Sequence, residues 1–152
     1  MATRSTIAVE TQDGRIQQVY CHWDGYLDNN GKILIEHYKD WSKAIALVAM
    51  GDLSSLRKEL GKKHDFDARY DADDERKQWT TFYGRDRGET GCEAKTFENF
   101  EVYRQNHQYE EYEYVMRSNG EWFVSEYSGP YVPLADAIAA EMMNKEMEVD
   151  DE

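Results

Sequence analysis

Two stretches of alternating apolar and polar residues predict β-hairpins. The first hairpin joins strands over residues 6–11 and 16–23 through Asp13-Gly14. An Asp-Gly pair favours a two-residue hairpin turn, because the central positions of that turn need positive φ angles. This turn would place Ile7 opposite Tyr20. Neither face of the hairpin is cleanly polar, so we expect it to lie inside a sheet rather than at a bare edge.

The second hairpin joins strands over residues 109–117 and 121–127. Its turn, Ser118-Asn119-Gly120, contains an Asn-Gly pair, which favours the same kind of tight connection. Pairing about that dipeptide would place Val115 opposite Val124. Both valines are then expected in the core.

Helical spacing and helix-capping residues predict the other elements. The strongest signal covers residues 41–50, where Asp40 caps the start of the helix and Gly51 ends it. The remaining elements are short helices over 33–38 after Asn30, over 53–60 after Asp52 and over 97–106 after Thr96, a final helix from Pro133 onward, a strand over 78–84 and an acidic loop over 62–77.

Strands and helices in this order predict an α+β fold. We expect a single domain over residues 1–140, with a largely antiparallel sheet built on the two hairpins and helices packed on one side. Residues 141–152 form an acidic C-terminal tail, which we expect to fray.

The negative charge is concentrated in the second part of the chain. Residues 1–64 hold nine Lys/Arg and eight Asp/Glu, whereas residues 65–152 hold nine Lys/Arg and twenty-three Asp/Glu. A field this one-sided repels phosphate backbones and attracts basic surfaces. We therefore expect no direct binding of nucleic acid. The aromatic strands over 109–127 are also interleaved with glutamates rather than with the basic residues that nucleic acid needs.

A fixed array of carboxylates can imitate a phosphate backbone and occupy the nucleic-acid groove of another protein. The second hairpin and the final helix would display such an array. The alternative is that the charge only keeps the protein in solution. The predicted partner-binding residues are Glu110, Glu111, Glu113, Glu121, Glu126, Glu141, Glu146, Glu148, Asp150, Asp151 and Glu152.

A second interpretation is a small enzyme or a ligand-binding module. His22 and Asp24 can share one face of a strand end, where an aspartate orients a histidine for proton transfer. Arg85 and Arg87 flank an acid in a glycine-bracketed turn, which suits bidentate binding of a carboxylate or phosphate. The structural alternatives are a strand that simply ends here and ion pairs that hold the turn. The interpretation requires these four side chains to converge on one concave site.

No pattern predicts a metal site or a cofactor. The aspartates of residues 65–74 do not fit the EF-hand template, because Tyr70 stands in place of the required glycine. Cys21 and Cys92 are expected to be free thiols of a cytoplasmic protein. The sequence lacks an apolar run long enough to span a membrane and an N-terminal secretory signal. The composition does not determine the oligomeric state and leaves a homodimer open.

Four segments resemble a family of short acidic proteins encoded by tailed bacteriophages, prophages and other mobile elements. They are MATRSTIAVE (1–10), VYCHWDGY (19–26), GDLSSL (51–56) and TFYGRDRGE (81–89). The resemblance extends over nearly the whole chain, to about Tyr127. It carries over no catalytic or binding residue, and what it implies is a genomic setting. Small accessory phage proteins commonly bind host enzymes and disable or redirect them.

Together, the charge and the resemblance predict a non-enzymatic protein of the host cytoplasm. We expect it to bind and inhibit a host protein, in particular a nucleic-acid-binding defence enzyme, by presenting a surface with the negative charge of nucleic acid.

Overall fold

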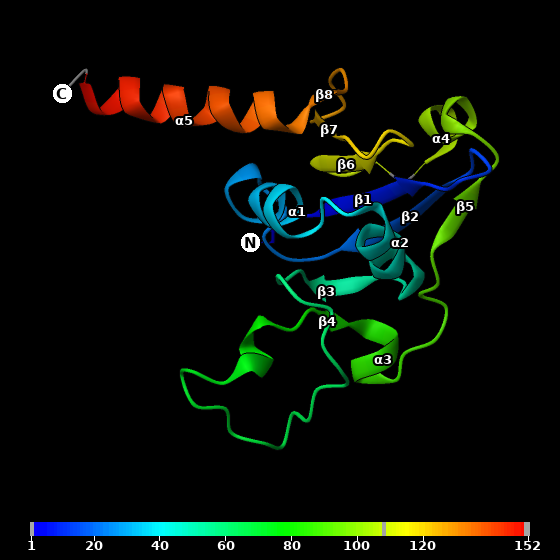
Figure 1. Cartoon of the computed structure of the whole chain (residues 1–152), viewed down its shortest axis with the longest axis vertical. Coiled ribbons are helices and arrows are strands. Elements are labelled where there is room, and N and C mark those ends of the chain that lie inside the picture. Colours follow the sequence, from blue (N-terminus) through cyan, green and yellow to red (C-terminus); the bar gives the residue numbers. More distant parts are fainter. Residues whose placement is uncertain (1, 108, 151–152) are drawn as a thin grey trace.

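Eight strands form one sheet at the centre of the molecule (Figure 1). The computed structural model describes the backbone of residues 2–107 and 109–150, and the side chains of these residues as far as residue 146. The strands are β1 (Ser5–Glu10), β2 (Ile16–Cys21), β3 (Leu53–Ser55), β4 (Thr81–Phe82), β5 (Lys95–Phe97), β6 (Tyr112–Met116), β7 (Trp122–Glu126) and β8 (Val132–Pro133).

The order of the strands is β4-β3-β2-β1-β6-β7-β8, and β5 pairs with β2 in addition. The two predicted hairpins, β1–β2 and β6–β7, lie side by side because β1 pairs with β6 in parallel. β2 and β3 also pair in parallel, and the other pairings are antiparallel. The predicted α+β fold with a largely antiparallel sheet is confirmed.

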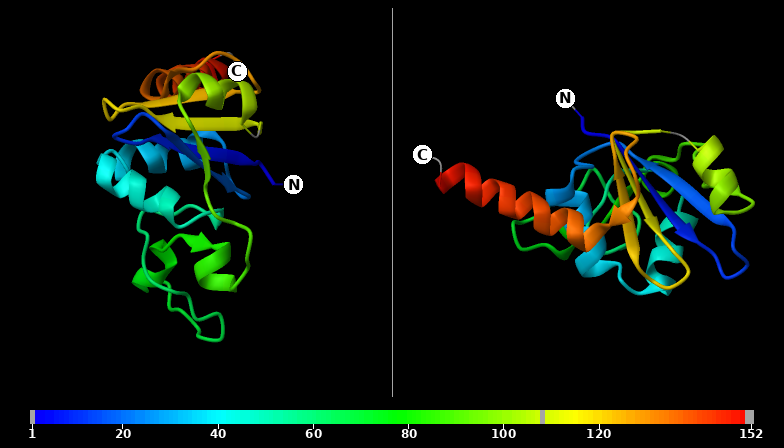
Figure 2. Two further views of the ribbon diagram at one scale, coloured as in Figure 1. Left: turned by 90° about the vertical axis from the view of Figure 1, so that its right-hand side faces the viewer. Right: turned by 90° about the horizontal axis from the view of Figure 1, so that it is seen from above.

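Short helical turns and five α-helices connect and cover the strands. They are η1 (Leu27–Gly31), α1 (Lys32–His37), α2 (Trp41–Ala49), η2 (Glu75–Gln78), α3 (Tyr83–Arg87), α4 (Phe100–Asn106) and α5 (Leu134–Asp150). α1, α2 and α5 pack on one face of the sheet, as predicted, and bury Ile7 and Val9 of β1 in the main core. Adjacent strand residues point to opposite faces. Ala8 therefore faces the other side, where the short helix α4 supplies Tyr103 to a smaller cluster (Figure 2).

The register predicted for both hairpins is wrong by one residue. In the first hairpin, Thr11 N donates to Arg15 O at 2.8 Å, so the loop has three residues and ends at Gly14 with φ = 85°. Ile7 consequently pairs with Val19. The glycine occupies the left-handed position of a three-residue loop, not the second position of a two-residue turn.

The second hairpin repeats this arrangement. Arg117 N donates to Glu121 O at 3.0 Å, Gly120 has φ = 83°, and Val115 pairs with Phe123. An Asx-Gly pair satisfies the backbone of either loop length, so the local sequence does not distinguish the two registers. Val115 and Val124 are buried all the same, as predicted.

The predicted helix over residues 53–60 is wrong, and the chain forms β3 instead. Asp52 Oδ1 does not cap a helix but accepts a hydrogen bond from Tyr20 N at 2.9 Å, and Leu53 pairs with Cys21 of β2. Gly51 makes this connection possible. It has φ = 84°, and a Cβ atom there would lie 2.4 Å from Cys92 O.

Helix caps also differ from the prediction at two positions. Asp40 caps α2 as expected, with its carboxylate accepting from Ser42 N at 2.9 Å. Asn99 instead of Thr96 caps α4. Asn30 is buried and donates to Ser5 Oγ and Cys21 Sγ, so it acts as a polar core residue rather than as a cap.

Helix α5 extends away from the sheet beyond its contacts with η1, β7 and β8 (Figure 1). It continues as a helix to Asp150, and Asp151 and Glu152 lie outside the described residues. Fraying of residues 141–152 therefore stays a prediction. No helix in the described ranges has the length and apolar character needed to cross a membrane.

Candidate functional site

Arg85 and Asp86 are part of a buried ion pair that supports the fold. Arg85 Nε lies 3.0 Å from Asp86 Oδ1, and the aspartate side chain has no exposed surface. The carboxylate also accepts from Phe82 N at 2.7 Å and from His64 N at 2.9 Å. The guanidinium donates to the carbonyl oxygens of residues 60, 61 and 80. These partners occupy Arg85 and tie the segment between β3 and β4 to α3.

The other three residues of the predicted ligand site also make structural contacts. His22 Nδ1 lies 2.7 Å from the Tyr20 hydroxyl, and the Asp24 carbonyl accepts from the backbone and side chain of the 29–30 segment. The exposed Arg87 lies over the ring of Tyr83. None of the four residues lines either of the two pockets described below. The structure gives no sign of the convergence that the ligand-site interpretation requires.

Glu113 does not belong to an exposed acidic surface. Its side chain is 1% exposed and faces the side of the sheet covered by α4. The error has a simple cause, because alternate residues of β6 point to opposite faces and both faces of this strand are covered. Glu121, Glu126 and Glu146 are exposed, and Glu110, Glu111 and Glu141 are partly exposed. The side chains of Glu148 and Asp150 lie outside the described residues, as do Asp151 and Glu152.

Three carboxylates line one groove between the end of β7 and helix α5. Glu126, Asp136 and Glu141 share this groove with the apolar side chains of Leu27 and Val132, and its volume is about 510 Å³. Asp136 and Glu141 both come from α5, and both side chains line the groove. We call these three residues the acidic groove. Glu121 lies at the opposite end of β7, next to the 118–120 loop, and is not part of it.

The positive charges of the same region are already paired. From residue 109 onward the sequence contains only two basic residues, Arg117 and Lys145. Arg117 lies 3.4 Å from the carboxylate of Glu10. Lys145 Nζ lies 3.4 Å from Asp28 and 4.0 Å from Glu141. Lys145 thus touches the rim of the acidic groove and leaves Glu126 and Asp136 without a counter-charge of their own chain in the described part.

Partial burial raises the pKa of Glu126, and the nearby carboxylate of Glu141 raises it further. A carboxyl with a raised pKa in the folded state destabilises the fold once it ionises. Glu126→Gln should therefore increase the free energy of unfolding near pH 7 by less than about 1 kcal/mol, since the group is exposed. The gain should disappear near pH 3, where the glutamate is protonated in both states. Urea unfolding at the two pH values tests this, and a loss of stability at pH 7 would contradict the repulsion.

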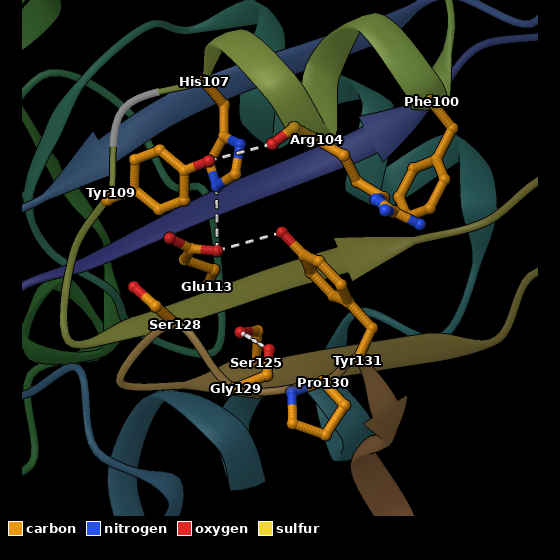
Figure 3. A pocket seen from close by; sticks show the side chains of 10 residues that line it. All are labelled: Phe100, Arg104, His107, Tyr109, Glu113, Ser125, Ser128, Gly129, Pro130 and Tyr131. Carbon is orange, nitrogen blue, oxygen red and sulfur yellow. Dashed lines mark hydrogen bonds and ion pairs between the residues drawn. The ribbon is translucent and has the colours of Figure 1, made fainter.

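A second cavity lies on the opposite face of the sheet, between α4, β6, β7 and the loop before β8 (Figure 3). Its volume is about 530 Å³, which is in the range of small-molecule sites. Aromatic side chains of Phe100, Tyr109 and Tyr131 form much of its wall, and Arg104 lies at its edge. Glu113 and His107 form its polar floor. The sequence did not single out this region as a site.

His107 and Glu113 form a buried pair in this cavity. His107 Nε2 lies 2.9 Å from Glu113 Oε2, and the two side chains are 2% and 1% exposed. The Tyr131 hydroxyl donates to the same oxygen at 2.9 Å. Burial and the Glu113 carboxylate raise the pKa of Tyr131, so this hydroxyl keeps the proton that it donates.

The other ring nitrogen of His107 fixes the orientation of the imidazole. Nδ1 lies 2.6 Å from the carbonyl oxygen of Tyr103, and a carbonyl oxygen only accepts, so Nδ1 carries a proton. The imidazole is also packed between two aromatic rings, with centroid distances of 4.4 Å to Tyr103 and 4.2 Å to Tyr109. The ring therefore has little freedom to rotate away from Glu113.

Strained backbone borders the same cavity. Tyr127 and Ser128 have φ angles of 52° and 63° in the tight turn that connects β7 to β8. Turns of this kind favour Asn and Gly, and a left-handed conformation costs other residues about 1 kcal/mol or more. The turn is closed by a 3.0 Å hydrogen bond from Gly129 N to Glu126 O. It places Ser128 and Gly129 in the cavity wall.

The sequence offered little signal for this site. His107, Glu113 and Tyr131 come from the end of a helix, a strand and a loop, and no spacing rule connects them. A glutamate between two aromatic residues of a strand with buried neighbours, Tyr112-Glu113-Tyr114, was the one available clue. Within the described residues, no group of three or more His, Cys, Asp or Glu side chains is arranged to hold a metal ion.

Comparisons of the chain with protein-family models, curated proteins and solved structures find no match.

Proposed function

We propose that the chain is a phage-encoded accessory protein that binds a basic surface of a host protein in the cytoplasm and thereby inhibits it. The target class that suits the charge best is a nucleic-acid-binding defence enzyme. The proposal rests on one observation above the others, the acidic groove formed by Glu126, Asp136 and Glu141. The protein would act by binding and not by catalysis.

The groove is suited to bind a positively charged side chain of a partner protein. Its carboxylates are held on the ordered elements β7 and α5, so their spacing does not depend on a flexible tail. The raised pKa of Glu126 reflects burial and repulsion that a lysine or arginine of a partner would relieve. A formal net charge of −13 would also accelerate the encounter with a basic surface.

Helix α5 adds apolar area beside the carboxylates. Met142 and Met143 of this helix are 49% and 62% exposed. Methionine side chains adapt to differently shaped partner surfaces. An interface of this kind would combine charge steering with a hydrophobic contact, which is typical of protein partners.

Affinity capture from infected host cells tests the proposal. The tagged protein should retain a host protein that itself binds nucleic acid, and a short DNA duplex should displace that protein in proportion to its concentration. Raising the salt concentration from 0.05 to 0.5 M should weaken the complex, because screening shortens the reach of exposed charges. Capture of a partner that binds no nucleic acid, or a complex that tolerates bound DNA, would contradict nucleic-acid mimicry.

A further inference from the structure

The cavity on the α4 face contains polar atoms that lack partners. Glu113 Oε1 and His107 Nε2 are buried, and among the described residues neither makes a hydrogen bond of good geometry. Nε2 lies within ion-pair distance of Glu113 Oε2, but the alignment is poor. Buried polar groups are nearly always satisfied, so each exception needs an explanation. A ligand that donates a hydrogen bond to Glu113 Oε1 would explain why this oxygen has no partner within the chain.

The carboxylate has a free acceptor on the side that faces the cavity. Oε2 already lies next to His107 Nε2 and accepts from the Tyr131 hydroxyl. In Figure 3, the other oxygen of Glu113 points away from these two partners, toward Tyr109 and Ser128. A group that binds Oε1 must therefore be a hydrogen-bond donor, because a carboxylate or phosphate ligand would place two acceptors against each other.

The aromatic wall favours a flat cation over a neutral donor. The rings of Tyr109 and Tyr131 line the cavity around Glu113, and aromatic faces attract guanidinium groups. The ring of Phe100 already holds the guanidinium of Arg117, 3.8 Å from its centroid. The field of a chain with a net charge of −13 concentrates cations. Arg104 at the edge opposes this attraction, but its side chain is exposed and its charge is weakened by water.

We propose that this cavity binds a guanidinium or amidinium group, which donates an N–H to Glu113 Oε1 and packs against the tyrosine rings. A quaternary ammonium would fit the aromatic wall but has no hydrogen to donate. The group could belong to a free small molecule or to an arginine side chain of a protein. The proposal does not depend on the function of the acidic groove, which lies on the other face of the sheet.

A series of three compounds of equal shape tests the charge of the ligand. Benzamidine is a cation with N–H donors, benzamide is neutral with N–H donors, and benzoate is an anion without them. Titration of ¹⁵N-labelled protein should give saturable shifts of amides at residues 104–107, 125–129 and 131 with benzamidine, with at least tenfold weaker binding of benzamide and none of benzoate. N-acetylarginine methylamide, added in a second titration, represents an arginine side chain.

Saturable binding of the arginine compound assigns the site to a protein side chain, and binding of benzamidine alone assigns it to a free ligand. Either result supports the proposal. Absence of saturable shifts at these residues with both cations up to 10 mM would overturn it. Binding of benzoate equal to that of benzamidine would also overturn it and assign recognition to Arg104.

Two variants separate the recognition from the fold. Glu113→Gln keeps the shape of the side chain but removes the charge, and it should weaken benzamidine binding at least about tenfold. Thermal unfolding would show whether this buried variant stays folded. Arg104→Gln alters an exposed side chain and should strengthen benzamidine binding about two- to threefold by removing a like charge. Weaker binding of benzamidine to Arg104→Gln would contradict a cationic ligand even if Glu113→Gln did not fold.

Discussion

Asp86→Ala is expected to lower the free energy of unfolding by about 3 to 5 kcal/mol, one of the largest losses available in this chain. The substitution leaves the Arg85 guanidinium, whose side chain is only 15% exposed, without its carboxylate partner. It also removes the acceptor of Phe82 N and of His64 N. Urea unfolding at pH 7 would measure the loss, and Arg87→Ala serves as a control because Arg87 is exposed and lies over Tyr83.

The ion pair of Arg85 and Asp86 should also make the stability of the protein depend on pH. Burial opposes ionisation of Asp86, but hydrogen bonds from Arg85 and from two backbone amides outweigh it and lower the pKa of the carboxyl below 3.8. The stability that comes from Asp86 is then fully present above pH 4 and is lost as the pH falls through the lower pKa of the folded state. The difference between the wild type and Asp86→Asn should shrink between pH 4 and pH 2. A difference independent of pH would contradict the assigned ion pair.

The second large effect concerns the buried pair on the α4 face. His107→Phe keeps a ring between Tyr103 and Tyr109 but removes the nitrogen that lies 2.9 Å from Glu113 Oε2, so the buried carboxyl loses a polar neighbour. We expect a loss of about 3 to 5 kcal/mol. Adding Glu113→Gln removes the unpaired charge while keeping an acceptor for the Tyr131 hydroxyl. The double variant should therefore be more stable than His107→Phe alone.

Urea unfolding of the two single variants, the double variant and the wild type completes this cycle. A double variant less stable than His107→Phe would show that Glu113 is stabilised independently of the histidine. Phe100→Leu provides a packing control, because Phe100 lines the same cavity and makes no polar contact with the pair. It should lose stability without any coupling to Glu113→Gln.

Local signals predicted the two hairpins and helix α2, but they failed for both hairpin registers and for the segment over 53–60. The predicted strand over 78–84 is also wrong for most of its length, because only Thr81–Phe82 is a strand and Tyr83–Arg87 forms α3. Helix α2 was predicted between Asp40 and Gly51 because the residue that caps its start and the glycine that ends it both lie next to the helix in the sequence. The segment after Asp52 has equally good helical spacing, yet β2 pairs with Leu53 and imposes a strand. Secondary-structure propensity is a weak preference that tertiary pairing overrides.

The sequence also did not show which acidic residues are buried and which are exposed. Sequence composition correctly indicates a surplus of carboxylates after residue 64, but it does not show which of them are buried. Glu113 pairs with His107 because β1 and β6 align in parallel and α4 crosses above them. Neither the pairing of β1 with β6 nor the position of α4 produces a periodic pattern in the sequence. The acidic groove also required the structure, since it joins Glu126 to a helix that begins eight residues later.

The most direct test of the proposed function compares two variants of equal charge. One carries Glu126→Gln, Asp136→Asn and Glu141→Gln in the acidic groove, and the other carries Asp67→Asn, Asp71→Asn and Asp73→Asn at exposed positions between β3 and η2. Association of each variant with the captured host protein would be measured by surface plasmon resonance at low salt. We expect the groove variant to bind at least about tenfold more slowly than the wild type and the loop variant to stay within about twofold. Equal loss in both variants would show that only the net charge matters, and an unchanged rate in the groove variant would contradict the acidic groove as the binding surface.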